Sequence, residues 1–125
     1  NEETKQKENI EKKIIFWNLP HILIIHLKRF TYTGKKINKP IDIPLELDLD
    51  NLVKDYNKSI NKFDLFGICN HMGGTMGGHY TACVKNANDK WYHYNDMQIQ
   101  EFKIDTPTIN NNISYCLFYR KKVIN

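Results

Sequence analysis

Long apolar runs, paired cysteines and clustered charge are all missing from this 125-residue sequence. No apolar segment is long enough to span a membrane, and the first residues are charged where a signal peptide is apolar. The cysteines Cys69, Cys83 and Cys116 form no CxxC pair and no metal-ligand spacing with histidine. We therefore expect an intracellular protein of the cytoplasm or nucleus, with reduced thiols and with no metal, cofactor or membrane partner.

Arginine is almost absent, since Arg29 and Arg120 are the only two. The formal net charge of +4 comes from lysines that are scattered among acidic residues. Arginine is the side chain that proteins use most to read base edges and to bind phosphates through two hydrogen bonds. A basic nucleic-acid-binding domain is therefore kept only as an alternative interpretation, with nucleic acid as a disfavoured partner.

The chain has room for one hydrophobic core. Its 125 residues are 41% hydrophobic and 12% aromatic, which is the composition of a single globular domain. Residues 1–13 alternate Lys and Glu with almost no apolar face, so we expect a disordered or frayed lead-in there. The domain then covers residues 14–121, and residues 122–125 form a tail.

Apolar patterning predicts strands and little helix. Residues 22–27 form a continuous apolar run that is typical of a central strand buried on both faces, which favours a core position for His26. Residues 50–62 and 99–108 carry no strand pattern and are expected to be irregular connections. Extended or strand-like segments are expected at 37–49, 63–69, 80–84, 91–94 and 113–120. Together these segments predict an antiparallel sheet of about five or six strands.

Four of the six glycines fall between residues 73 and 78. Glycine costs folding entropy but allows positive φ and close approach of another backbone, so we expect a mobile loop here. His79 follows at once and opens the strand-like run at 80–84. The sequence thus places a histidine at the boundary between a mobile segment and a rigid one.

A β-hairpin is predicted to follow His79, because a turn-forming Asn-Ala-Asn-Asp segment separates two strand-like runs. If Lys85 faces Trp91, opposed residue numbers sum to 176. His79 and Asn95 are then diagonal neighbours on one face, roughly 7–8 Å apart. With a turn one residue shorter, Asp96 lies opposite His79 instead. In either register a carboxamide or a carboxylate lies beside the imidazole.

This arrangement is typical of an oriented base. A histidine whose Nδ1–H is held by an Asn or Asp presents Nε2 in a fixed tautomer, ready to activate a Cys or Ser nucleophile. The competing interpretation is a structural histidine with a polar neighbour. The preceding glycines and the tryptophan-containing partner strand favour the first interpretation for His79.

Six blocks of residues resemble, in order and spacing, the C-terminal half of the catalytic domain of ubiquitin-specific proteases. They cover nearly everything from Leu19 to Tyr119, although any single block would be a weak signal. The blocks are Leu-Pro at 19–20 with Leu-Ile-Ile-His-Leu-Lys-Arg-Phe at 23–30, Phe-Asp-Leu-Phe-Gly at 63–67, Asn-His-Met-Gly at 70–73, Gly-Gly-His-Tyr-Thr-Ala at 77–82, Trp-Tyr-His-Tyr-Asn-Asp at 91–96 and Tyr-Cys-Leu-Phe-Tyr at 115–119.

The resemblance implies a papain-like cysteine peptidase with an α+β, mostly β fold, of which residues 14–121 are the palm part. Such an enzyme hydrolyses the peptide or isopeptide bond after the C-terminal glycine of ubiquitin. By position, His79 is the general base, Asn95 orients it and Asp96 supports the site. The resemblance therefore assigns a catalytic role to the histidine and amide that the hairpin register brings together.

The resemblance also implies how the ubiquitin tail is held. Tyr80 is expected to line a narrow channel for the tail. Gly77 and Gly78 are expected to let the tail pass backbone against backbone. His71 is expected to meet the substrate backbone or to brace the segment beside it.

Two loops, at 31–36 and 72–78, match the loops that gate this channel in the family, where a gate must move. The partners implied are ubiquitin or polyubiquitin conjugates and the remainder of the protein's own catalytic domain. That remainder consists of a thumb with the nucleophilic cysteine and a fingers region.

The sequence departs from the family in lacking the cysteine box and the zinc-bearing fingers. Its own cysteines lie in apolar strands, where buried structural thiols are the expected interpretation. We therefore predict that this chain by itself does not hydrolyse ubiquitin substrates. An alternative is that the full-length protein has lost its cysteine and is a catalytically dead ubiquitin-binding module.

Overall fold

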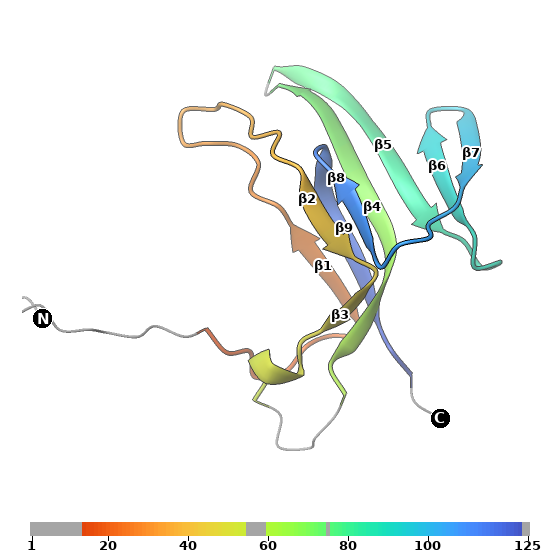
Figure 1. Ribbon diagram of the computed structural model, residues 1–125. Coiled ribbons are helices and arrows are strands. Elements are labelled where there is room, and N and C mark those ends of the chain that lie inside the picture. The colour runs from red at the N-terminus through yellow and green to blue at the C-terminus, as the bar shows by residue number, and fades with distance from the viewer. Residues whose placement is uncertain (1–13, 55–59, 75, 124–125) are drawn as a thin grey trace, which may run out of the picture.

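The computed structural model describes residues 14–54, 60–74 and 76–123, so the expected lead-in at 1–13 and the end of the tail lie outside the described residues. Within these residues the chain forms nine strands and one 3-10 helix (Figure 1). They are β1 (Ile22–His26), β2 (Ile41–Pro44), β3 (Glu46–Asp48), η1 (Asp50–Leu52), β4 (Lys62–Gly74), β5 (Gly77–Lys85), β6 (Trp91–Asn95), β7 (Gln98–Phe102), β8 (Thr108–Asn111) and β9 (Ser114–Lys121).

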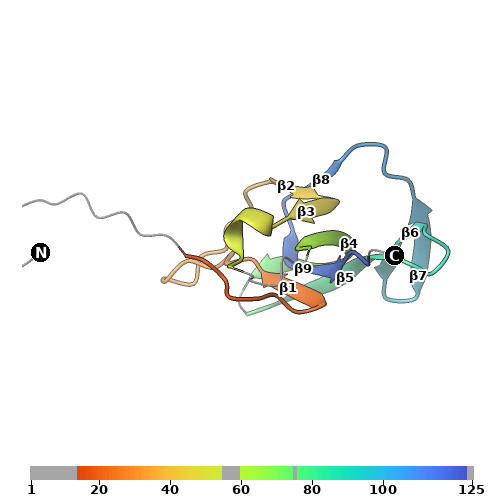
Figure 2. The ribbon, with the colours of Figure 1, turned by 90° about the horizontal axis from the view of Figure 1, so that it is seen from below.

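The main sheet has seven strands and is antiparallel throughout. Its order is β1-β9-β4-β5-β6-β7, and β3 pairs with the first residues of β4. Strands β2 and β8 form a separate two-stranded ribbon that lies over one face of the main sheet, as the view in Figure 2 shows. The expected mostly β, antiparallel architecture is confirmed, with more strands than the five or six predicted.

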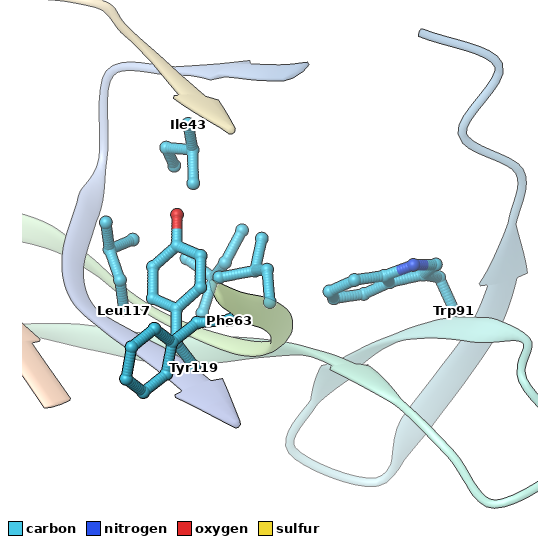
Figure 3. Close-up of a cluster of buried hydrophobic side chains, with 7 residues drawn as sticks. Ile43, Phe63, Trp91, Leu117 and Tyr119 are labelled. Carbon is cyan, nitrogen blue, oxygen red and sulfur yellow. The ribbon is translucent and has the colours of Figure 1, made fainter. Parts of the chain in front are cut away.

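The hydrophobic core lies between the main sheet and the ribbon, and Figure 3 shows Ile43 of β2 next to Tyr119 and Leu117 of β9. The hydroxyl of Tyr119 donates a hydrogen bond to the carbonyl oxygen of Pro44 at 2.7 Å, and burial raises the pKa of Tyr119 to about 12. The ribbon is therefore tied to the sheet through a buried tyrosine. The buried apolar side chains are Ile43, Phe63, Leu65, Ile68, Trp91, Leu117 and Tyr119.

Strand β1 is an edge strand, and among the described residues it pairs with β9 alone. Leu23 and Ile25 pack against the core, whereas Ile24 is 58% exposed. His26 is also exposed, with its ring 4.7 Å from the ring of Tyr115. The predictions of a central strand and of a core histidine were therefore wrong. A continuous apolar run does not reveal which of its faces will be covered.

Strand β7 was predicted to be part of an irregular segment at 99–108. Four of its five residues are exposed, and a strand without a buried face needs no alternation of apolar and polar residues. The sequence therefore carries no signal for this strand. Pairing with β6, from Asn95 with Gln98 to Trp91 with Phe102, forms this strand. Strand β7 therefore accounts for the seventh strand of the sheet.

The glycine-rich stretch forms the end of a long hairpin between β4 and β5, which corrects the prediction of a loop. The pairing continues to Gly74 opposite Gly77. Gly73 has a φ of 110°, and a Cβ on Gly73 would lie 2.8 Å from the Cα of Gly78. The glycines therefore allow two strands to approach closely, a use of glycine that competes with loop formation.

The register between β5 and β6 is the first of the two that the sequence left open. Lys85 pairs with Trp91 and Ala82 pairs with Tyr94, so opposed residue numbers sum to 176. The backbone pairing ends at Ala82 and Tyr94, while β5 continues toward His79 paired with β4 only. The two strands thus have an open end on the side of the histidine.

Candidate active site

His79 and Asn95 meet across the open end of the β5–β6 pairing, between two strands that are neighbours in Figure 1. The Nε2 atom of His79 lies 2.6 Å from the Oδ1 atom of Asn95. Both side chains are half-buried, so the pair is shielded in part and still open to a substrate. The structure thus has the diagonal neighbours that the register predicted.

The ring orientation of His79 is the reverse of the one predicted. A carboxamide oxygen only accepts hydrogen bonds, so Nε2 of His79 carries the proton and donates it to Asn95. Nδ1 is then the nitrogen whose lone pair can take a proton. The physical reason is distance, because diagonal residues are far apart and Nε2, at the far side of the ring from Cβ, reaches the amide.

Asp96 lies in the two-residue turn between β6 and β7, with Asn95 paired to Gln98 on either side of it. Its φ of 51° is in the left-handed region, which Asp and Asn tolerate better than most residues. Its side chain is exposed, and within the described part of the chain it makes no hydrogen bond and no ion pair. The structure therefore brings together His79 and Asn95 and leaves Asp96 in the adjacent turn.

Gly77 and Gly78 are the first two residues of β5, and both are exposed. Gly77 has a φ of 151°, a conformation that residues with a side chain rarely adopt. A Cβ on Gly78 would lie 2.5 Å from Nε2 of His71 and 2.5 Å from the carbonyl oxygen of Met72. Packing inside the hairpin is enough to require glycine at 78, and contact with a substrate tail stays a prediction.

His71 and Tyr80 lie opposite each other on the other face of the hairpin from His79. The ring of His71 is 6% exposed and lies 4.7 Å from the ring of Tyr80 and 6.0 Å from that of Phe30. Its Nδ1 atom is buried and has no hydrogen-bond partner among the described residues. Tyr80 is 57% exposed and accessible to a ligand. Burial favours the bracing role for His71, and substrate contact by either residue stays a prediction.

The segment at 31–36, predicted as a gate, is a tight turn that contacts β4. The backbone N–H of Thr31 donates to the carbonyl oxygen of Lys35 at 2.7 Å. The Nζ atom of Lys36 donates to the carbonyl oxygen of His71. Burial and the nearby guanidinium of Arg29 lower the pKa of Lys36. The two segments predicted as gates are thus connected through the lysine and the backbone of β4.

A buried amide network beside the pair was missed by the sequence reasoning. Asn70 of β4 is 2% exposed, and its Nδ2 donates to Oγ1 of Thr81 at 3.2 Å. Its Oδ1 accepts a hydrogen bond from Nδ2 of Asn111 at 2.9 Å. Thr81 lies two residues from His79 on the same face of β5. The signal that could have indicated this network is an asparagine at the end of the apolar pattern of β4.

Arg29 was also missed as a structural residue, because the sequence showed only that arginine is scarce. Its side chain is 5% exposed and donates to the carbonyl oxygen of Ser114 at 2.6 Å and to the Ser114 hydroxyl at 3.0 Å. It also donates to the carbonyl oxygen of Lys39 at 2.6 Å. A buried cation that is held by neutral oxygens fixes the segment after β1 against the start of β9.

Comparison with known proteins adds to this geometry. A family model described as ubiquitin carboxyl-terminal hydrolase matches residues 1–119. The chain belongs to this family. It is 40% identical over 122 residues to ubiquitin carboxyl-terminal hydrolase 10 of Arabidopsis thaliana, with 94% of this chain and 13% of that protein covered. It is 35% identical to ubiquitin carboxyl-terminal hydrolase 15 of Rattus norvegicus, with the same two shares covered.

Solved structures of ubiquitin hydrolases share the fold. The Ubp8-Sgf11-Sgf73-Sus1 SAGA DUB module matches with a TM-score of 0.70 and 27% identity, over 86% of this chain and 25% of that chain. The same kind of module bound to ubiquitin aldehyde matches with a TM-score of 0.68 and 26% identity, over 86% of this chain and 26% of that chain. These matches confirm the expected mostly β fold of a papain-like peptidase. The alternative of a nucleic-acid-binding fold loses its support.

This member of the hydrolase family spans about 13% of the length of the curated relatives it matches. Its three cysteines are free and half-buried. Burial raises the pKa of Cys69, Cys83 and Cys116, and for Cys116 the neighbouring Cys69 adds to this effect. All three thiols therefore favour the protonated, weakly nucleophilic form.

No group of three or more His, Cys, Asp or Glu side chains within 14–54, 60–74 and 76–123 is arranged to hold a metal ion. In the same part of the chain no helix is long and apolar enough to cross a membrane.

Proposed function

We propose that this chain contributes the histidine half of the active site of a thiol-dependent deubiquitinase, which hydrolyses the bond after the C-terminal glycine of ubiquitin. The observation that carries the proposal is the 2.6 Å contact between Nε2 of His79 and Oδ1 of Asn95, in a member of the hydrolase family. The names of the relatives, and the ubiquitin aldehyde bound to one similar structure, support ubiquitin as the substrate.

His79 is suited to act first as a general base and then as a general acid. With Nε2–H held by Asn95, the lone pair of Nδ1 can take the proton of a thiol and leave a nucleophilic thiolate. The imidazolium formed in this step is stabilised by the amide oxygen at Nε2. Nδ1–H can then protonate the amine that leaves ubiquitin.

The thiol itself is proposed to come from the rest of the full-length protein. Cys83 shares a face of β5 with His79 but lies four residues away, which is roughly 13 Å along a strand. It pairs with His93 instead, and burial raises its pKa. The short share of the relatives' length that this chain covers supports the same proposal.

The remaining assignments follow from this proposal. Residues 14–121 form the palm part of the catalytic domain, and its partners are ubiquitin or polyubiquitin conjugates together with the thumb and fingers of the same protein. Tyr80 lines the channel for the ubiquitin tail, and Asp96 supports the histidine from the neighbouring turn. The site of action is the cytoplasm or the nucleus.

Hydrolysis of a ubiquitin–fluorophore conjugate by the full-length protein tests the proposal. Replacing His79 by Ala should lower kcat by about 10²–10⁴-fold, since this is the usual contribution of a general base. The matched control is His21→Ala, because His21 is an exposed histidine outside the site. Equal turnover by the wild type and the His79→Ala variant would overturn the proposal.

The catalytically dead ubiquitin-binding module is distinguished by the same assay. It requires that the full-length protein binds ubiquitin with no turnover, and that binding is unchanged in the His79→Ala variant. Turnover that depends on His79 excludes it. Turnover by the isolated chain, abolished by Cys83→Ala, would instead contradict the external origin of the thiol.

A further inference from the structure

A cleft of about 460 Å³ lies near Lys85, at the end of β5 that is farther from His79. Its floor is formed by Leu65 and Phe66 of β4. One wall is the turn between β5 and β6, and the other is the end of β9 and the residues after it.

The floor of the cleft is shaped by a β-bulge at Phe66. The β4–β9 pairing passes from Leu65 to Gly67 while β9 advances by a single residue, so Phe66 is left over. A bulge commonly redirects a side chain. Here the ring of Phe66 lies 6.3 Å from the ring of Phe118, and the guanidinium of Arg120 lies 4.6 Å from its centre. The floor is therefore an aromatic surface with a cation stacked on it.

The charge around the cleft is positive. Four cations and two carboxylates give a sum of +2, which is half of the formal charge of +4 on the whole chain. Lys122 already forms ion pairs, because its Nζ atom lies 3.0 Å from Asp64 and 3.2 Å from Glu46. The hydrogen bonds that Lys122 donates to these two carboxylates raise the pKa of Lys122. The charged residues that line the cleft are Lys85, Arg120, Lys121, Lys122, Asp64 and Asp89.

Arg120 is the cation best placed to bind a ligand. Within the described residues no carboxylate lies in ion-pair range of its guanidinium, although Asp64 is its partner in the β4–β9 register. The guanidinium lies over the ring of Phe66, and among the described residues its N–H edges make no side-chain hydrogen bond. An edge of this kind binds a carboxylate through two parallel hydrogen bonds.

We propose that this cleft binds an acidic segment of another protein, with its carboxylates at Arg120 and Lys85. Nucleic acid fits less well for one reason. Arg120 covers the ring of Phe66, on which a base would have to stack. The proposal is independent of the catalytic function proposed above.

Fluorescence anisotropy of the full-length protein with a fluorescein-labelled peptide of Glu, Asp and Leu tests this proposal. The acidic peptide should bind, and a matched peptide with Gln and Asn in place of Glu and Asp should bind at least about tenfold more weakly. Arg120→Gln should weaken binding of the acidic peptide by about tenfold, with Arg120→Lys between this variant and the wild type. Added salt should weaken binding further.

The control variant is Lys28→Gln, which removes the same charge from an exposed position on another part of the surface. It should leave the affinity for the acidic peptide unchanged. Equal binding of the acidic and amide peptides overturns the proposal, as does an unchanged affinity of the Arg120→Gln variant. Tighter binding of a labelled single-stranded DNA that displaces the peptide would show that the cleft is a phosphate-binding surface instead.

Discussion

The two faces of the β4–β5 hairpin hold two histidines in opposite environments. On one face His79 is half-buried, and its Nε2 is bonded to an amide oxygen. On the other face His71 is enclosed by aromatic rings, and its Nδ1 has no partner among the described residues. The first environment suits the proton transfer proposed for His79, and the second favours a packing role for His71. The neighbours of a histidine, more than its presence in a motif, decide what it can do.

The largest effect is expected for His71, and it is an effect on the free energy of unfolding. Replacing His71 by Ala should lower the free energy of unfolding by about 2–4 kcal/mol. Removing the ring from a packed site lowers stability, and removing a buried nitrogen that has no hydrogen-bond partner offsets part of this loss. His79→Ala should leave the free energy of unfolding within about 1 kcal/mol of the wild type. Urea unfolding of both variants measures the difference, and equal losses would remove the distinction between the two faces.

The side chain of Asn95 should affect kcat strongly and the free energy of unfolding little. Replacing Asn95 by Ala should lower kcat for the ubiquitin–fluorophore substrate by about 10–100-fold, since a hydrogen bond to a charged ring is worth about 1.5–3 kcal/mol. Asn95→Asp keeps an acceptor oxygen at the same place and should recover part of the rate. If Asn95→Ala turns over as fast as the wild type, the contact at Nε2 does not orient the base.

Two glycines at the end of the hairpin form a matched pair for stability. Gly78→Ala should lower the free energy of unfolding by about 1–3 kcal/mol, because its Cβ would meet the backbone oxygen of Met72 and the ring of His71. Gly74→Ala should be close to neutral, because nothing lies within 4 Å of a Cβ at that position. Thermal unfolding compares the two, and a larger loss for Gly74→Ala would contradict the described hairpin.

The smallest effect is expected at Asp96. Asn tolerates the left-handed conformation as well as Asp does, so Asp96→Asn should keep the turn and the stability of the protein. Its kcat should fall by less than that of Asn95→Ala, because the exposed carboxylate makes no hydrogen bond to His79 among the described residues. A loss of kcat as large as that of His79→Ala would instead place Asp96 directly in the proton transfer.

The sequence predicted the hairpin that carries the candidate site and limited its register to two alternatives, because turn residues separate two strand-like runs. Once Lys85 faces Trp91, the positions of His79 and Asn95 follow from counting. The orientation of the ring did not follow, since it depends on which nitrogen reaches across the strands. The catalytic roles themselves stay predictions until activity is measured.

Other parts of the fold could not be predicted from the sequence, for physical reasons. An apolar run such as β1 looks the same at the edge of a sheet as at its centre, because apolar residues remain apolar when exposed. Strand β7 is mostly exposed and is held by pairing with β6, which leaves no pattern in its own residues. The glycines of β4 and β5 were read as a loop because close strand approach depends on both segments together.

The place of the contact between His79 and Asn95 has a mechanical consequence. Backbone pairing of β5 with β6 stops at Ala82 and Tyr94, so the side-chain hydrogen bond joins two strands whose main chains have already separated. Fraying of the β6–β7 hairpin would therefore also break the contact that is proposed to orient His79. The rate of proton transfer in this protein would report how firmly β6 and β7 are attached to the rest of the sheet.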